Sequence, residues 1–206
     1  RKPGEDKSVR SYMFMVRSKI PGGKITAKQF LTELNLCEKY GNGTLRITTR
    51  QGLQLHGILK ENLRQTIHDI NSCLLSTLGA CGDVNRNVMC CPAPHHGNGP
   101  HDQLQKVADQ LAAHLAPRTR AYHEIWVNGE QVEDFPDRGT SAEEPIYGAV
   151  YMPRKFKIGI ALPEDNCVDI YANDLGLLAI VENGQLIGFN VLVGGGMGIA
   201  TILERV

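Results

Sequence analysis

The stretch SYMFMVRSKIPGGKIT, residues 11–26, opens the part of the chain that decides the fold. Tyr12, Phe14 and Val16 alternate with neighbours that are smaller or more polar, and this period of two predicts a β-strand. The strand should end at the Pro-Gly-Gly turn of residues 21–23.

A helix is expected after this turn. Thr26 has a side chain suited to an N-cap, and Gly-Asn-Gly at residues 41–43 suits the helix end. Apolar residues spaced for one helical face predict the buried side, and they are Phe30, Leu31, Leu34 and Cys37.

Two short β-type runs follow at residues 45–48 and 53–58, and a second helix is then marked by apolar residues three or four positions apart. These helical positions are Leu63, Ile67, Ile70, Leu74 and Leu78. The order β-α-β-β-α is most of a split βαβ unit, in which two helices cover one face of an antiparallel sheet. We therefore predict an α+β protein that contains a ferredoxin-like half-domain.

The second half of the chain combines one more helix with several strands. Residues 79–100 have no hydrophobic period and predict a long functional loop. Asn183-Gly184 predicts a type I′ hairpin turn. The expected helix spans residues 104–115, and the expected strands span 121–127, 156–162, 168–171, 177–181 and 186–193. We place a first domain at residues 1–100 and a second, mixed α/β domain at 101–206.

Composition excludes some classes of protein. The chain has 206 residues, of which 42% are hydrophobic and 21% charged, and no segment reaches the ~20 apolar residues of a membrane span. The formal net charge is zero, so no nucleic-acid partner is required. Six cysteines are too sparse for a disulfide scaffold and favour a reducing compartment.

Basic residues at strand ends and in glycine- or asparagine-rich loops suggest an anion site. Lys155 and Lys157 lie two residues apart at the start of a predicted strand, and in extended backbone such side chains can point to the same face. The other basic clusters are Arg17 with Lys19, Arg46 with Arg50, and Arg86 between two asparagines. Arginine suits bidentate binding of oxyanions, whereas the alternative is a set of ordinary solvated surface charges.

Two further motifs have no chemistry of their own. Cys90 and Cys91, followed by His95 and His96, lack the spacing of a structural zinc site, so we predict packing thiols and no metal site. The glycine run at residues 194–198 has neither the Lys-Ser/Thr of a P-loop nor the spaced glycines of a dinucleotide site.

Four strings together resemble the assimilatory sulfite reductases, within the sirohaem-dependent nitrite and sulfite reductase family. They are DVNRNVMC at 83–90, RTRAYHEIW at 118–126, YMPRKFK at 151–157 and GFNVLVGGGMG at 188–198. The resemblance runs in family order from about Tyr12 to Gly198. It implies the N-terminal half of an enzyme that reduces sulfite to sulfide with six electrons.

The resemblance also implies the cofactors and their contacts. They are sirohaem, which carries eight carboxylates, and a four-iron four-sulfur cluster. Positions that would surround sulfite are Arg17, Arg86, Lys155 and Lys157. Positions that would face the macrocycle are Thr48, Thr49, Arg50, Gln54, Arg154, Gly194, Gly195 and Gly196.

The family's cluster cysteines form two short-spaced pairs that these 206 residues lack, so we expect the cluster ligands outside this chain. Residues 199–206 depart from the family pattern, which suggests a fragment, a split subunit or a truncated relative. The electron donor is expected to be ferredoxin or a flavoprotein subunit, with the strings of the second domain favouring ferredoxin. The expected location is the cytoplasm, or the plastid in a plant or alga. A non-catalytic tetrapyrrole- or anion-binding module and a purely structural domain are the alternatives.

Overall fold

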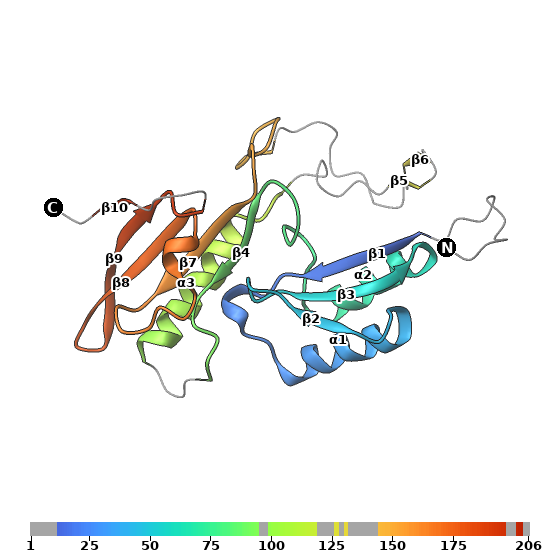
Figure 1. The fold of residues 1–206 in the computed structure, drawn as a ribbon, viewed down its shortest axis with the longest axis horizontal. Helices are drawn as coiled ribbons and strands as arrows, with labels where there is room; N and C mark the ends of the chain where they lie inside the picture. Colours follow the sequence, from blue (N-terminus) through green and yellow to red (C-terminus); the bar gives the residue numbers. More distant parts are fainter. Residues whose placement is uncertain are drawn as a thin grey trace.

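The computed structural model describes residues 12–94, 99–118, 126–127, 130–131, 144–196 and 201–203. Within these ranges the chain forms two larger sheets that lie beside each other, each packed against at least one helix, and a small two-stranded sheet (Figure 1). No helix among the described residues is long and apolar enough to cross a membrane.

The first sheet is antiparallel, with the strand order β1-β3-β2. Its strands are β1 (Met13–Ser18), β2 (Leu45–Ile47) and β3 (Leu53–Leu59), and the helices α1 (Ala27–Tyr40) and α2 (Leu63–Ser72) pack against it. Val16 and Leu55 of the sheet form a buried core with Leu36 of α1 and Ile70 of α2. The predicted β-α-β-β-α order and the ferredoxin-like half-domain are confirmed.

Helix α1 begins where the sequence predicts but buries a different face. Thr26 Oγ1 accepts a hydrogen bond from the backbone N–H of Gln29, and the Thr26 N–H donates to Gln29 Oε1. A complete capping box therefore starts the helix. The prediction that Phe30, Leu31 and Leu34 are buried was wrong, because these side chains are exposed. The buried residues of the helix are Glu33, Leu36 and Cys37. Both stripes have helical spacing, and hydropathy favoured the wrong one because the buried stripe contains a glutamate.

The second sheet has the strand order β10-β9-β8-β7-β4, with parallel pairing of β4 to β7 and of β7 to β8. Its strands are β4 (Asn85–Met89), β7 (Phe156–Ala161), β8 (Leu175–Glu182), β9 (Gln185–Val193) and β10 (Thr201–Leu203). Helix α3 (Pro100–His114) packs Leu104 and Ala108 against this sheet. Asn183 and Gly184 have φ values of 50° and 76°, which agrees with the predicted type I′ hairpin.

Two segments of this half differ from the sequence-based expectation, and a third lies mostly outside the described residues. The segment 79–100 is not a continuous loop, because it contains β4. Since β4 pairs with β7, the chain enters the second sheet ahead of the boundary expected after residue 100. The strand predicted at 168–171 was wrong: the Asn166 side chain accepts from the Ile170 N–H, and this turn leads into the short 3-10 helix η4 (Ile170–Ala172). Of the strand predicted at 121–127, residues 121–125 lie outside the described residues.

Short pieces complete the described chain. They are the 3-10 helices η1 (Pro21–Gly23) and η2 (Lys60–Asn62), and the paired strands β5 (Trp126–Val127) and β6 (Glu130–Gln131).

Polar contacts join the two sheets. The buried Asn87 amide of β4 donates to the Ile20 carbonyl at 2.6 Å and to the Arg50 carbonyl at 2.8 Å. In the other direction, the Gln51 side-chain amide donates to the Cys90 carbonyl at 2.6 Å. The turn between β2 and β3 is therefore fixed against β4, and this seam positions the site.

Candidate anion-binding site

A cleft of about 330 Å³ lies at the seam between the two sheets. It is lined by five cationic side chains and by no carboxylate among the described residues. The cations are Arg17, Lys19, Arg50, Arg86 and Lys155, and the other lining residues are Ser18, Thr48, Thr49, Gly52, Gln54, Ala80 and Asn87. Positive charge that is concentrated in a concave, partly desolvated site favours an anionic ligand.

Arg17 reaches the cleft because it lies on β1 between the buried Val16 and Ser18, so it points away from the helices. Its Nη1 donates to the Ala80 carbonyl at 3.1 Å. Its register partner on β3 is Gln54, and with the Gln54 amide oxygen turned toward Arg17, that oxygen accepts from Arg17 Nε at 3.0 Å. The guanidinium is thus held at both ends.

Arg86 comes from β4 and meets Arg17 at the same backbone oxygen. Its Nε donates to the Ala80 carbonyl at 3.0 Å, and its Nη2 donates to the same oxygen. The segment that carries Ala80 therefore anchors one arginine from each sheet.

Lys19 is 7% exposed, and its Nζ has no hydrogen-bond partner among the described residues. Burial, with a smaller contribution from the Arg86 guanidinium, lowers the pKa of Lys19 from 10.5 to about 8. A buried ammonium with unmet donors is costly unless an anion or water satisfies it. Lys19 was recognised in the sequence as a neighbour of Arg17 but was not assigned to the site. Its spacing of two residues from Arg17 was the available signal.

Arg50 connects the two sheets. Its Nη2 donates to the Asn87 carbonyl at 2.6 Å and its Nη1 to the Asn173 side chain at 3.1 Å, while its buried Nε has no partner among the described residues. Burial, followed by the neighbouring Arg86 charge, lowers the pKa of Arg50 to about 10, and Asp174 opposes the shift. Arg50 therefore remains charged at neutral pH.

Hydrogen bonds within the turn fix the backbone that carries Thr48, Thr49 and Arg50. Thr48 Oγ1 accepts from the backbone N–H groups of Arg50 and Gly52 at 3.3 and 3.0 Å, and the Thr48 N–H donates to the Gly52 carbonyl at 2.8 Å. A Cβ at Gly52 would lie 3.0 Å from the Ser18 carbonyl oxygen, so this close approach favours glycine.

Of the basic residues predicted at 154, 155 and 157, only one lines the cleft. Lys155 is exposed and lines the cleft, whereas Arg154 is exposed and is not among the lining residues. Lys157 lies elsewhere: its Nζ donates to the carbonyls of Ala172 and Gly196 at 3.2 and 3.1 Å. The expected convergence of Lys155 and Lys157 on one cleft is therefore not observed.

The glycine run also lies outside the cleft lining. The Gly194 N–H donates to the Asp174 carbonyl at 3.0 Å. A Cβ at Gly195 would clash with the Tyr171 carbonyl oxygen, and one at Gly196 would clash with the Asp174 carboxylate. Close packing on the loop before β8 thus accounts for Gly195 and Gly196.

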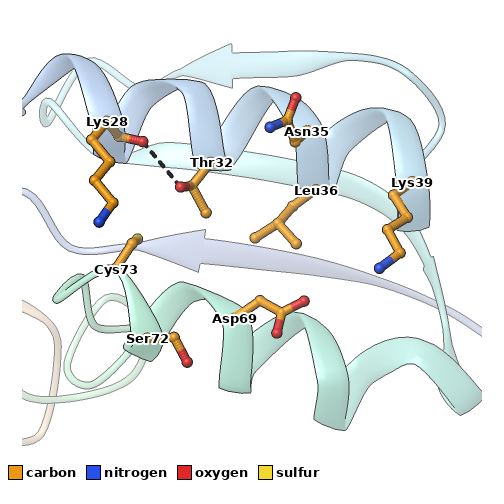
Figure 2. A pocket seen from close by; sticks show the side chains of 8 residues that line it. All are labelled: Lys28, Thr32, Asn35, Leu36, Lys39, Asp69, Ser72 and Cys73. Carbon is orange, nitrogen blue, oxygen red and sulfur yellow. Dashed lines mark hydrogen bonds between the residues drawn. The ribbon is translucent and has the colours of Figure 1, made fainter.

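A second cleft of about 350 Å³ lies between α1 and α2 (Figure 2). Its lining combines Lys28 and Lys39 with Asp69 and several small polar or apolar residues. Because its charges are of both signs and no buried donor without a partner lines it, this helix–helix groove gives no sign of an anionic ligand.

Two family models match successive parts of the chain. The nitrite/sulfite reductase ferredoxin-like half domain matches residues 7–73, and the nitrite and sulphite reductase 4Fe-4S domain matches residues 106–205. The first range contains β1 to α2, and the second contains the strands of the five-stranded sheet other than β4.

Similar proteins agree with these matches. The sulfite reductase [NADPH] hemoprotein beta-components of Staphylococcus saprophyticus and of a Paenibacillus species are 54% and 56% identical over 189 residues, which is 92% and 91% of this chain and 32% of each relative. The chain thus spans about a third of the length of these relatives.

Solved structures share the fold. The NirA protein of Mycobacterium tuberculosis superposes with a TM-score of 0.66 at 22% identity, over 98% of this chain and 34% of that one. Dissimilatory sulfite reductase I gives a TM-score of 0.55 at 15% identity, over 83% of this chain and 34% of that one. The two domain matches and the high identity to the hemoprotein components lead to one conclusion: the chain belongs to the nitrite and sulfite reductase family and corresponds to its N-terminal part.

Proposed function

We propose that this chain forms the cationic wall of the active site of a sirohaem-dependent sulfite reductase, which reduces sulfite to sulfide with six electrons. The observation that carries the proposal is the convergence of Arg17, Lys19, Arg50, Arg86 and Lys155 on one cleft without an opposing carboxylate among the described lining residues. The unmet donors of Lys19 and Arg50 fit a ligand with several anionic oxygens.

Different residues are proposed to contact the sulfite and the macrocycle. Arg17 and Arg86 are proposed to bind the sulfite oxygens with their guanidinium forks and to offset the sulfite charge in a site of low dielectric. Arg50, Thr48, Thr49 and the exposed Arg154 are proposed to hold carboxylates of the macrocycle, together with Gln54. The sirohaem, when bound, supplies the iron at which sulfite takes up electrons.

Each S–O bond that breaks releases its oxygen as water, so protons must be delivered within the cleft. Lys155 is proposed as a donor because its exposed amine can be reprotonated from solvent. Lys19 is a second proposed donor, since a pKa of about 8 suits proton transfer near neutral pH. Lys157 is proposed to position the glycine run through its bonds to Ala172 and Gly196 rather than to touch sulfite.

The cluster and the electron donor are proposed to lie beyond this chain. All six cysteines are described and none of them forms a disulfide, and the one group of potential metal ligands among the described residues contains only two of them, whereas a four-iron cluster needs four. The sparse cysteines of the sequence support a reducing compartment such as the cytoplasm. The named relatives are NADPH-linked beta-components, which supports a flavoprotein partner that passes electrons from NADPH rather than the ferredoxin favoured by the sequence.

The test is sulfide production by the full-length protein that contains this chain, supplied with sulfite and a strong artificial reductant. Arg86→Ala should lower the rate ~100-fold or more, because it removes one preorganised charge aimed at the transition state. Arg64→Ala is the matched control, since Arg64 is exposed on α2 and does not line the cleft. Sirohaem binding without any sulfide formation by the wild-type protein would favour the non-catalytic module instead.

A further inference from the structure

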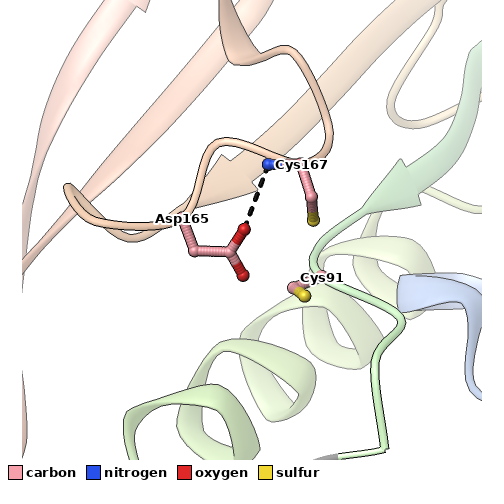
Figure 3. Close-up of side chains that lie close together, drawn as sticks. All are labelled: Cys91, Asp165 and Cys167. Carbon is pink, nitrogen blue, oxygen red and sulfur yellow. Dashed lines mark hydrogen bonds between the residues drawn. The ribbon is translucent and has the colours of Figure 1, made fainter.

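Cys91, Asp165 and Cys167 lie close together beside the second sheet (Figure 3). None of the three lines the cationic cleft. Their two sulfur atoms and a carboxylate oxygen all lie within 4.8 Å of one another. Cys91 follows β4, whereas Asp165 and Cys167 lie in the loop after β7. The parallel pairing of β4 with β7 brings these segments together.

The loop that carries Asp165 and Cys167 is fixed by its own hydrogen bonds. The Asp165 N–H donates to the Leu162 carbonyl at 3.1 Å, and the Cys167 N–H donates to Asp165 Oδ1 at 3.2 Å. Asn166 caps the following turn through the Ile170 N–H at 2.8 Å. The carboxylate is thus oriented before any ligand arrives.

Cys91 is fixed from the other side. The preceding residue, Cys90, is buried in the core, and its carbonyl accepts from the Gln51 amide at 2.6 Å. Cys91 itself is half-buried and Cys167 is exposed, so one edge of the group is open to solvent. A cation could enter by this edge.

His101, in the first turn of α3, adds a fourth group. Its Nε2 lies 3.5 Å from Asp165 Oδ2, and its side chain is 25% exposed. Metal-binding carboxylates and imidazoles are commonly held by such outer partners, which fix the orientation of the ligand.

We propose that Cys91, Cys167 and Asp165 form a binding site for a zinc-like divalent cation, with His101 as a positioning residue. Two thiolates and a carboxylate are a ligand set that suits zinc, and three protein ligands leave a fourth position for water. Tetrahedral bonds of ~2.3 Å to sulfur and ~2.1 Å to oxygen place ligand atoms roughly 3.5 to 3.8 Å apart. Side-chain rotations that bring these atoms closer by at most about 1 Å would therefore complete the site.

This site is distinct from the cofactors of the proposed reaction. It has two thiolates where a four-iron cluster requires four, and it shares no residue with the cationic cleft. It would join the end of β4 to the loop after β7, so the metal would fix two segments of one sheet.

The experiment uses the full-length protein, freed of loosely bound metal and kept reduced with a phosphine. Equilibrium dialysis against Zn²⁺ alone, followed by elemental analysis, gives zinc bound per chain. Cys167→Ser and Asp165→Asn should each weaken zinc binding at least ~10-fold relative to the wild type. Cys73→Ser is the matched control, because Cys73 is a half-buried thiol outside the group.

Zinc-edge X-ray absorption identifies the ligands without interference from iron. The wild type should show two sulfur neighbours at ~2.3 Å. His101→Gln should weaken binding ~10- to 100-fold but retain both sulfur neighbours, as expected for a residue that acts through Asp165.

Two results would overturn the proposal. One is zinc binding by Cys167→Ser equal to that of the wild type. Because Cys167 is exposed, this variant is expected to fold normally. The other is a Cys91–Cys167 disulfide that persists under the reductant while no zinc binds, which would assign the pair a covalent link.

Discussion

Arg17 and Arg86, which come from different sheets, donate to the same carbonyl oxygen of Ala80, at 3.1 Å from Arg17 Nη1 and 3.0 Å from Arg86 Nε. The shared acceptor holds two like charges beside each other, where they would otherwise repel. An anion placed between them would relieve that repulsion, so the arrangement is ready for a ligand.

Arg86→Lys should weaken sulfite binding to the full-length protein about 10- to 100-fold. Lysine keeps the charge but cannot reproduce the fork that places both Nε and Nη2 on the Ala80 carbonyl. A charged hydrogen bond contributes ~1.5 to 3 kcal/mol, which corresponds to this range. Titration of the oxidised protein with sulfite measures the affinity, with Arg64→Lys as the control. Wild-type affinity in Arg86→Lys would show that charge alone suffices.

Anion affinity should fall as the pH rises through about 8, because Lys19 loses its charge there. Sulfate is the suitable probe, since its own charge is constant in this range. Lys19→Arg should retain its affinity from pH 7 to pH 9, because arginine stays protonated. The dissociation constant for sulfate, measured across this range, checks the prediction, and an identical pH profile for both proteins would remove Lys19 from the site.

The lowered pKa of Lys19 also predicts how this residue affects the free energy of unfolding. Its pKa in the folded protein lies below the unfolded value of 10.5, so the unfolded state binds more protons between these values. Without an anion, the buried charge should cost about 3 kcal/mol below pH 8, and this cost should diminish as the pH rises toward 10.5. Lys19→Met should therefore stabilise the ligand-free protein most at neutral pH, as shown by the midpoint of urea unfolding. A larger gain at pH 10 than at pH 7 would reverse the sign and contradict this account.

Arg50→Met should loosen the seam between the sheets. The substitution keeps much of the buried volume but leaves the Asn87 carbonyl and the Asn173 side chain without their guanidinium donors. An unsatisfied buried acceptor costs ~1 to 3 kcal/mol. Hydrogen exchange should accelerate at β4 and at Ile170–Ala172, while the far end of the β8–β9 hairpin stays protected. Uniform exchange throughout the second sheet would indicate global rather than local loss of structure.

Glu33→Gln should stabilise the protein more at pH 8 than at pH 5. Glu33 is fully buried, its Oε2 has no partner among the described residues, and burial raises its pKa although the Ser18 hydroxyl bond opposes the shift. A raised pKa means that the folded state favours the protonated form, so the wild type loses stability as the pH rises. Glutamine is neutral at every pH and can still accept from Ser18. Thermal midpoints of both proteins at the two pH values provide the test, and a larger benefit at pH 5 would refute it.

The sequence by itself determined the elements whose causes are local. The period-two run in β1, the Thr26–Gln29 capping box and the Asn183-Gly184 turn depend on backbone preferences and near neighbours, and each forms where the residues predict it. It also identified Arg17, Arg50, Arg86 and Lys155 as basic residues outside ordinary helix faces.

Only the tertiary structure decided which of these charges converge. Lys155 lines the cleft and Lys157 does not, although both were expected on one face, because Lys157 bonds to carbonyls of two distant loops. The sequence also did not predict which face of α1 is buried or that Cys91 lies close to Cys167. The physical reason is the same in each case: sheet order and register place residues from distant segments side by side, and a local pattern carries no information about that pairing.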